Sequence, residues 1–151
     1  MLFDPQAIMN AAIEGVMETR RTPVPVGDYR GQITKIVPRA GQSKDGDSWV
    51  ALDIFVELES DERLTKLGLE KRVMKGGMML DLTDSGGLDL GKNKNVRLGA
   101  LRDAVGQNIP GQVWSPTMLV GQLVTVTVKH RLDPADPSLV YDEIATFGKY
   151  R

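Results

Sequence analysis

The chain has 151 residues, 41% hydrophobic and 26% charged, which predicts one domain with one hydrophobic core. Its 19 lysines and arginines against 20 aspartates and glutamates give a net charge of −1, without the basic excess typical of proteins that bind nucleic acid mainly by charge. It has no cysteine, which excludes disulfides, thiolate zinc sites and a cysteine nucleophile. No apolar run approaches the ~18 residues of a membrane span and no signal peptide opens the chain, so we expect a soluble intracellular protein without a membrane partner.

The first 26 residues are expected to form an arm. Asp4 can cap a helix and Pro5 suits its first position, and apolar residues then recur at helical spacing along "PQAIMNAAIEGVMETR". The following "TPVPV" favours extended chain. The predicted organisation is therefore a helix with a proline-rich arm (residues 1–26) and a β-domain (residues 27–151). The helix would either pack on its own domain or bind a partner; the residues expected to bind are Ile8, Met9, Ile13, Met17, Pro23, Val24 and Pro25.

After Gly27, apolar and polar residues alternate, which predicts strands. In "WVALDIFVEL", Val50, Leu52, Ile54, Val56 and Leu58 form one apolar face. The predicted strands are "DYRGQITKIV", ended by Pro38, then "WVALDIFVEL", "VMKGGMMLDLT", "GQLVTVTVKHR" and "SLVYDEIATFG". The double glycine of the third strand suggests a bulge or a bend.

Two helices are expected between these strands. "ESDERLTKLGLEKR" predicts a short one after the second strand, and "NVRLGALRDAVG" an amphipathic one between the third and fourth, stopped by Gly106. Three strands, a helix and two strands predict a mainly β fold, a five-stranded OB-like β-barrel. A β-sandwich or an irregular α+β arrangement would give similar patterns.

The segment "DSGGLDLGKNKN", residues 84–95, resembles part of a phosphate-binding P-loop, G-x-x-x-x-G-K-[ST]. Asn93 stands where a P-loop has the magnesium-binding hydroxyl, and the alternating strands do not suit a parallel βαβ sheet. The helix also begins several residues after Lys92. The segment is therefore predicted to be a long turn with glycines at positive φ, ending in a helix cap at Asn93 or Asn95.

Few residues are suited to catalysis or to metal binding. His130 is the single histidine, and no G-x-S-x-G nucleophile motif is present. The spacing of Asp81, Asp84 and Asp89 does not match a calcium-binding loop. The sequence predicts a protein that is not an enzyme and has no cofactor and no metal site.

Binding of single-stranded nucleic acid would need cations beside aromatic rings on which bases stack. The segments "GKNKNVR" and "KHR" each carry three cations without an acid. The principal candidates are Tyr29, Trp49, Lys92, Lys94, Lys129 and Arg131, and a wider set adds Arg30, Lys35, Phe55, His130 and Tyr141. Aromatic residues make up only 5% of the chain, so these side chains would equally suit solvated strand faces or the ends of a barrel.

Several segments together resemble a family of small phage-encoded OB-fold-like proteins. These are "PVPVGDYRGQITKI", "SWVALDIFVEL", "LGALRDAVG", "LVGQLVTVTVKHR" and "VYDEIATFGK", and the similarity spans residues 23–149. The family is linked to single-stranded DNA in phage replication or recombination modules. The matching residues set turns and core, so the resemblance implies the fold more than the function.

The resemblance leaves two functions open. The first is a virion structural protein, a capsid decoration or cement protein that stabilises the head through its arm and β-domain. Its partners would be the capsid protein or copies of itself in an assembly, and it would reside in the virion, and in the host cytoplasm before assembly. The balanced charge, the few aromatics and the end "FGKYR" instead of an acidic tail favour it. The alternative is a single-stranded DNA-binding protein.

Overall fold

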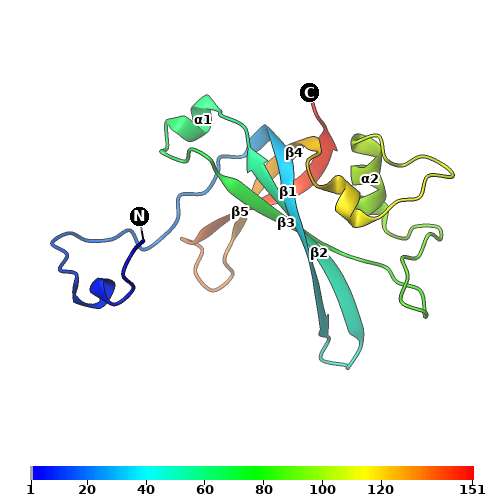
Figure 1. Cartoon of the computed structure of the whole chain (residues 1–151), viewed down its shortest axis with the longest axis horizontal. Helices are drawn as coiled ribbons and strands as arrows, with labels where there is room; N and C mark the ends of the chain where they lie inside the picture. The colour runs from blue at the N-terminus through cyan, green and yellow to red at the C-terminus, as the bar shows by residue number, and fades with distance from the viewer. Residues whose placement is uncertain (1) are drawn as a thin grey trace.

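A computed structural model describes residues 2–151 and contains one five-stranded antiparallel sheet (Figure 1). The strands are β1 (Gly27–Gln42), β2 (Ser48–Leu58), β3 (Val73–Met79), β4 (Leu123–Leu132) and β5 (Val140–Lys149), in the order β3-β2-β1-β4-β5. The helices are α1 (Glu62–Thr65) and α2 (Val96–Ala104), with 3₁₀ turns η1 (Ala7–Asn10) and η2 (Pro116–Leu119). Within the described residues no helix is both long and apolar enough to cross a membrane.

The predicted order of elements is confirmed. All five strands form, α1 follows β2, and α2 lies between β3 and β4. Asn95 occupies the N-cap position of α2, but its side chain makes no capping hydrogen bond among the described residues. Gly106 follows the helix at φ +73°, a conformation that glycine adopts without strain. The fold is therefore mainly β, as the alternation of apolar residues predicted.

The predicted closure into a barrel is wrong. The edge strands β3 and β5 lie close together, but the described residues form no β3–β5 ladder. A Cβ built on Gly76 of β3 would lie 2.7 Å from the ring of Phe147 and 3.4 Å from Ile144, both on β5. Side chains of β5 therefore occupy the space next to the backbone of β3. Pairing also runs through Gly76 and Gly77 without a register shift, so the bulge suggested there is not found.

The strand β1 is longer than predicted, because it continues past Pro38. It pairs with β4 only from Gly27 to Gln32, but with β2 as far as Gln42, with a register shift between Ile33 and Lys35. At Pro38 the strand thus has one neighbour, and an edge strand accommodates a residue without an amide hydrogen. As a result the end of the β1–β2 hairpin projects beyond the rest of the sheet (Figure 1).

The predicted N-terminal helix is also wrong. Asp4 accepts a hydrogen bond from the Gln6 amide at 3.0 Å, but the resulting turn, η1, ends at Asn10, and the chain then becomes extended. Ile13 and Met17 of the predicted stripe are exposed. A short isolated helix is marginal in water, and this arm loops away from the sheet without a surface to pack on (Figure 1).

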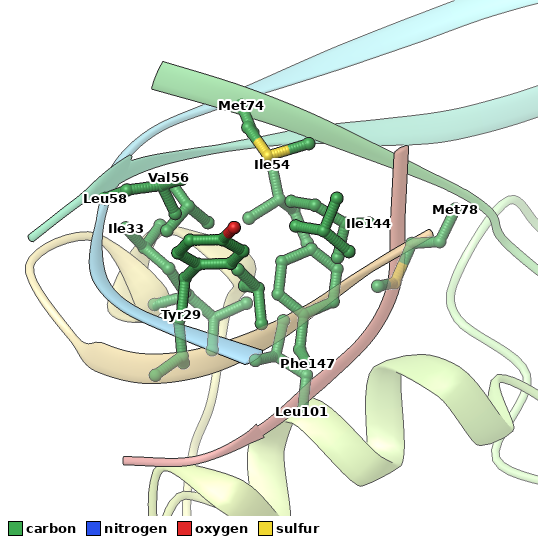
Figure 2. Close-up of a cluster of buried hydrophobic side chains, with 14 of the residues drawn as sticks. Tyr29, Ile33, Ile54, Val56, Leu58, Met74, Met78, Leu101, Ile144 and Phe147 are labelled. Atoms are coloured by element: carbon green, nitrogen blue, oxygen red, sulfur yellow. The ribbon is translucent and has the colours of Figure 1, made fainter. Parts of the chain in front are cut away.

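The core lies on one face of the sheet, closed by α2 (Figure 2). Its fully buried side chains include Ile33, Ile54 and Val56, with Leu101 from α2. The arm also reaches this core, because Val24 is 0% exposed. Its amide donates to Asp142 Oδ2 at 2.7 Å, and its carbonyl oxygen lies 2.7 Å from His130 Nε2. The end of the arm is therefore fastened to β4 and β5.

Two glycine-to-alanine substitutions should have opposite effects on stability. Gly76→Ala places a methyl group against Phe147 and is expected to lower the free energy of unfolding by about 1–3 kcal/mol. Gly99→Ala, inside α2 with open space around it, should raise that free energy by about 0.5–1 kcal/mol. Urea denaturation measures both; a neutral Gly76→Ala would contradict the close approach of β3 and β5.

Candidate nucleic-acid interface

The outer face of the sheet carries an aromatic ring between two lysines. Phe55 of β2 pairs across the strands with Lys35 of β1 and with Lys75 of β3. Its neighbours Ile54 and Val56 are fully buried, so strand alternation directs Phe55 to the opposite face. Lys35 Nζ lies 4.5 Å from the ring centroid. Within residues 2–151 neither lysine forms an ion pair, so both charges are available to an anion beside the ring.

An open hollow of about 280 Å³ lies beside Lys75, between β3, α2 and β5. Lys75, Arg97 of α2 and Lys129 of β4 line it, over the bare backbone of Gly76 and Gly77. Arg97 Nη1 donates to the Gly77 carbonyl oxygen at 3.2 Å, and one acid, Glu143, lies 3.5 Å from Lys129. Three cations against one carboxylate around this hollow suit a phosphate group.

A second hollow, of about 490 Å³, is also lined by Lys75, together with Phe55 and Arg21 of the arm. Arg72 also lines it and pairs with Asp142 at 3.4 Å. The two hollows share Lys75, so cations follow one another across the face. We name this set the cationic band: Arg21, Lys35, Arg72, Lys75, Arg97 and Lys129.

The structure brings only part of the predicted nucleic-acid set to this face. Lys129 belongs to the cationic band, and Arg131 also pairs with Glu143, at 3.5 Å. Trp49 lies near the end of the β1–β2 hairpin, packed on Gly41. Lys92 is exposed in the loop before α2, and Lys94 of the same loop lines a different hollow, beside Trp114.

Tyr29 is not a stacking surface, which corrects the prediction for this residue. Its ring is 2% exposed, and its hydroxyl donates to the Pro25 carbonyl oxygen at 2.7 Å. Burial raises the pKa of Tyr29, an effect that the nearby Arg63 charge partly opposes. Without an exposed ring face, Tyr29 stabilises the core and holds the arm.

Sequence reasoning missed Arg21, Arg72, Lys75 and Arg97. Alternation in "VMKGG" places Lys75 on the face opposite the buried Met74, so the direction of its side chain could be predicted from the sequence. Its position next to Phe55 depends on the β2–β3 register, and that of Arg97 depends on the docking of α2. Neither the β2–β3 register nor the docking of α2 can be predicted from the residues next to Lys75 or Arg97 in the sequence.

The arm residues predicted to bind a partner divide into two groups. Ile8, Met9, Ile13 and Met17 are exposed, whereas Pro23 and Pro25 flank the buried Val24. Between the groups, Arg20 donates to the Ser138 hydroxyl at 2.7 Å and pairs with Asp136 at 3.3 Å. Hydrogen bonds from Ser138, followed by the Arg20 charge, hold the pKa of Asp136 below its usual range. The exposed members of the predicted set therefore lie before Arg20, and the members near Val24 are partly or fully buried.

The P-loop-like segment is held by hydrogen bonds within residues 81–95 and does not form a phosphate-binding loop. The Asn95 side chain donates to the carbonyl oxygens of Asp81 and Asp89, at 2.8 and 3.0 Å, and accepts from the Asp81 amide at 2.9 Å. The Asn95 amide in turn donates to Asp81 Oδ2 at 2.7 Å. Gly86 has φ +90° in a turn closed by Thr83, as predicted for a long glycine turn. Residues 2–151 hold no group of three or more His, Asp or Glu side chains arranged for a metal ion.

Comparison with known proteins identifies no family: no protein-family model matches the chain, and no curated protein matches it significantly.

Removal of the Asn95 side chain should loosen residues 80–95. Asn93 and Asn95 both have positive φ, 63° and 50°, but Asn93 has no side-chain hydrogen bond among the described residues. Asn93→Ala therefore measures backbone strain alone, and Asn95→Ala should cost about 1–3 kcal/mol more in the free energy of unfolding. Urea denaturation measures this difference, and hydrogen exchange should show faster opening of the loop. Equal costs would mean that the Asp81–Asn95 contacts contribute no stability.

Proposed function

We propose that this protein binds single-stranded DNA on the outer face of its sheet, as part of a phage replication or recombination module. The observation that carries the proposal is Phe55, placed between Lys35 and Lys75, neither of which pairs with a carboxylate within residues 2–151. Proteins that bind single strands combine cations that follow the backbone with aromatic rings on which bases stack. A near-neutral net charge is compatible with binding of single-stranded DNA, because the cations of the cationic band lie together.

The ring and the charges favour an unpaired strand over a duplex. A base can stack on Phe55 only if its own face is free, and in a duplex the neighbouring base pairs cover that face. The hollow lined by Lys75, Arg97 and Lys129 then receives a backbone phosphate. The role proposed for the protein is to hold exposed single strands, without chemistry of its own.

The topology supports an OB-like relationship. In the order β3-β2-β1-β4-β5 the central strand is β1, a helix lies between β3 and β4, and the edges β3 and β5 approach each other. OB-folds bind oligonucleotides on the face of their second and third strands, and Phe55 and Lys75 lie on those strands here.

The binding role is tested with a labelled oligo-dT, by fluorescence anisotropy at low and moderate salt. Phe55→Leu keeps the apolar bulk but removes the π-face, and we expect it to weaken binding by about 1–3 kcal/mol. Lys75→Ala should weaken binding and lower the magnitude of the salt slope by about 0.7, the contribution of one phosphate contact to a single strand.

The matched control is Lys66→Ala. It removes the same charge from Lys66, the C-cap residue of α1, which pairs with Glu62 at 3.3 Å and is not part of the cationic band. This variant should bind like the unmodified protein. Absence of binding at low salt, or equal losses in Lys66→Ala and Lys75→Ala, would refute the proposal.

A second candidate is a capsid decoration protein, favoured by the arm. Leu2, Phe3, Ile8, Met9 and Met17 are exposed on a segment that loops away from the sheet (Figure 1). Exposed apolar side chains of this density are typical of a surface that binds another protein, here the capsid protein or further copies of the chain. If the protein decorates the capsid, mass spectrometry should detect it in purified particles of the phage that encodes it, at a fixed ratio to the capsid protein. Its absence from those particles would exclude the virion role.

A further inference from the structure

We infer that Arg39, held in place by Asp53 and Trp49, is a second phosphate-binding position on the projecting β1–β2 hairpin. The inference rests on the proposed binding of single-stranded DNA. It extends the interface from Phe55 along β2 toward the hairpin end, because Phe55, Asp53, Ala51 and Trp49 alternate on one face of that strand.

Two contacts orient the Arg39 side chain. Its Nε donates to Asp53 Oδ2 at 2.6 Å, and its guanidinium carbon lies 5.5 Å from the centroid of the Trp49 ring. Trp49 is itself fixed, because it lies directly over Gly41, where a Cβ would be 2.5 Å from its ring. An arginine restrained at Nε and by an aromatic ring loses little further freedom when it binds a ligand.

The contact with Asp53 leaves the other end of the guanidinium unused. Within residues 2–151 neither Nη atom of Arg39 has a hydrogen-bond acceptor, and the side chain is 49% exposed. A Cβ atom on residue 77 would lie 3.7 Å from Arg39 Nη2. Because this residue is a glycine, no side chain covers the Nη end of the guanidinium there. Two adjacent Nη donors match two oxygens of a phosphate, the geometry in which arginine binds phosphate most strongly.

Asp53 is difficult to explain by stability alone. It is 4% exposed, and its Oδ1 has no hydrogen-bond partner among the residues that the structure describes. A buried carboxylate with one unsatisfied oxygen costs stability, and such a group calls for another explanation. Orientation of Arg39 provides one: Asp53 is a positioning residue, and Arg39 is the residue that contacts the phosphate.

Arg30 offers a matched comparison on the same strand. Its Nε also contacts a carboxylate, Glu59 at 3.3 Å, its guanidinium lies 5.8 Å from the Tyr150 ring centroid, and its side chain is 55% exposed. Although the sequence placed Arg30 in the wider set of candidates, it lines neither hollow of the cationic band. It lies at the opposite end of β1, where Glu57 and Glu59 line a different hollow. Arg30→Ala therefore removes an equivalent charge outside the proposed path of the DNA.

The test is oligo-dT binding by fluorescence anisotropy across a salt series. We expect Arg39→Ala to weaken binding about tenfold and to lower the magnitude of the salt slope by about 0.7, with Arg30→Ala unchanged. Arg39→Lys keeps the charge but not the forked donors, so it should preserve the salt slope and still lose affinity. Equal effects of Arg39→Ala and Arg30→Ala would overturn the inference.

The Asp53 variants separate positioning from simple charge. Asp53→Ala frees Arg39 and should weaken binding although it removes a negative charge, whereas Asp53→Asn retains an acceptor for Nε and should bind at least as well as the unmodified protein. In the Arg39→Ala background, Asp53→Ala should cause no further loss. Tighter binding by both single variants would show that Asp53 only repels DNA and would overturn its assigned role. Urea denaturation confirms that each variant is folded.

The two proposals fail in different ways. If Phe55→Leu and Lys75→Ala weaken binding but Arg39→Ala does not, the hairpin position is wrong and the proposed function stands. If none of these variants changes the affinity, or the unmodified protein does not bind, both proposals are wrong.

Discussion

The burial of alternate side chains on β2 is the constraint on which the rest of the structure depends. Ile54 and Val56 are fully buried in the core, so the residue between them cannot avoid the outer face. The half-buried Phe55 therefore lies on the outer face because its two neighbours are buried in the core. A slip of one residue in the β2 register would bury Phe55 and expose the core, so the fold and the proposed binding face are specified together.

The projecting hairpin follows from unequal pairing of β1. Its first part has β4 and β2 as neighbours, and after the register shift near Ile33 only β2 remains. The freed part of the hairpin has no neighbour on one side, which accommodates Pro38 and leaves Arg39 half exposed. The β1–β4 ladder thus ends at Gln32, and the part of β1 beyond it carries Arg39, the residue proposed to bind a phosphate.

The arm is attached to the last two strands of the sheet by polar contacts of its buried end. Val24 is buried, and its amide and carbonyl contact Asp142 and His130, which lie on the last two strands. Arg21 lies only a few residues earlier and lines the hollow beside Phe55. The exposed part of the arm, proposed to bind a partner protein, therefore begins next to the face that is proposed to bind DNA.

The sequence by itself determined the five strands, the helix α2 and the outward direction of Phe55 and Lys75, because alternation and capping are local properties of neighbouring residues. It did not determine that "PQAIMNAAIEGVMETR" would remain largely non-helical, since a helical stripe forms a stable helix only when a surface covers it. The open form of the sheet, the burial of Tyr29 and the meeting of Lys75, Arg97 and Lys129 were decided by tertiary structure. Each depends on strand register and helix docking between distant segments, which local patterns do not encode.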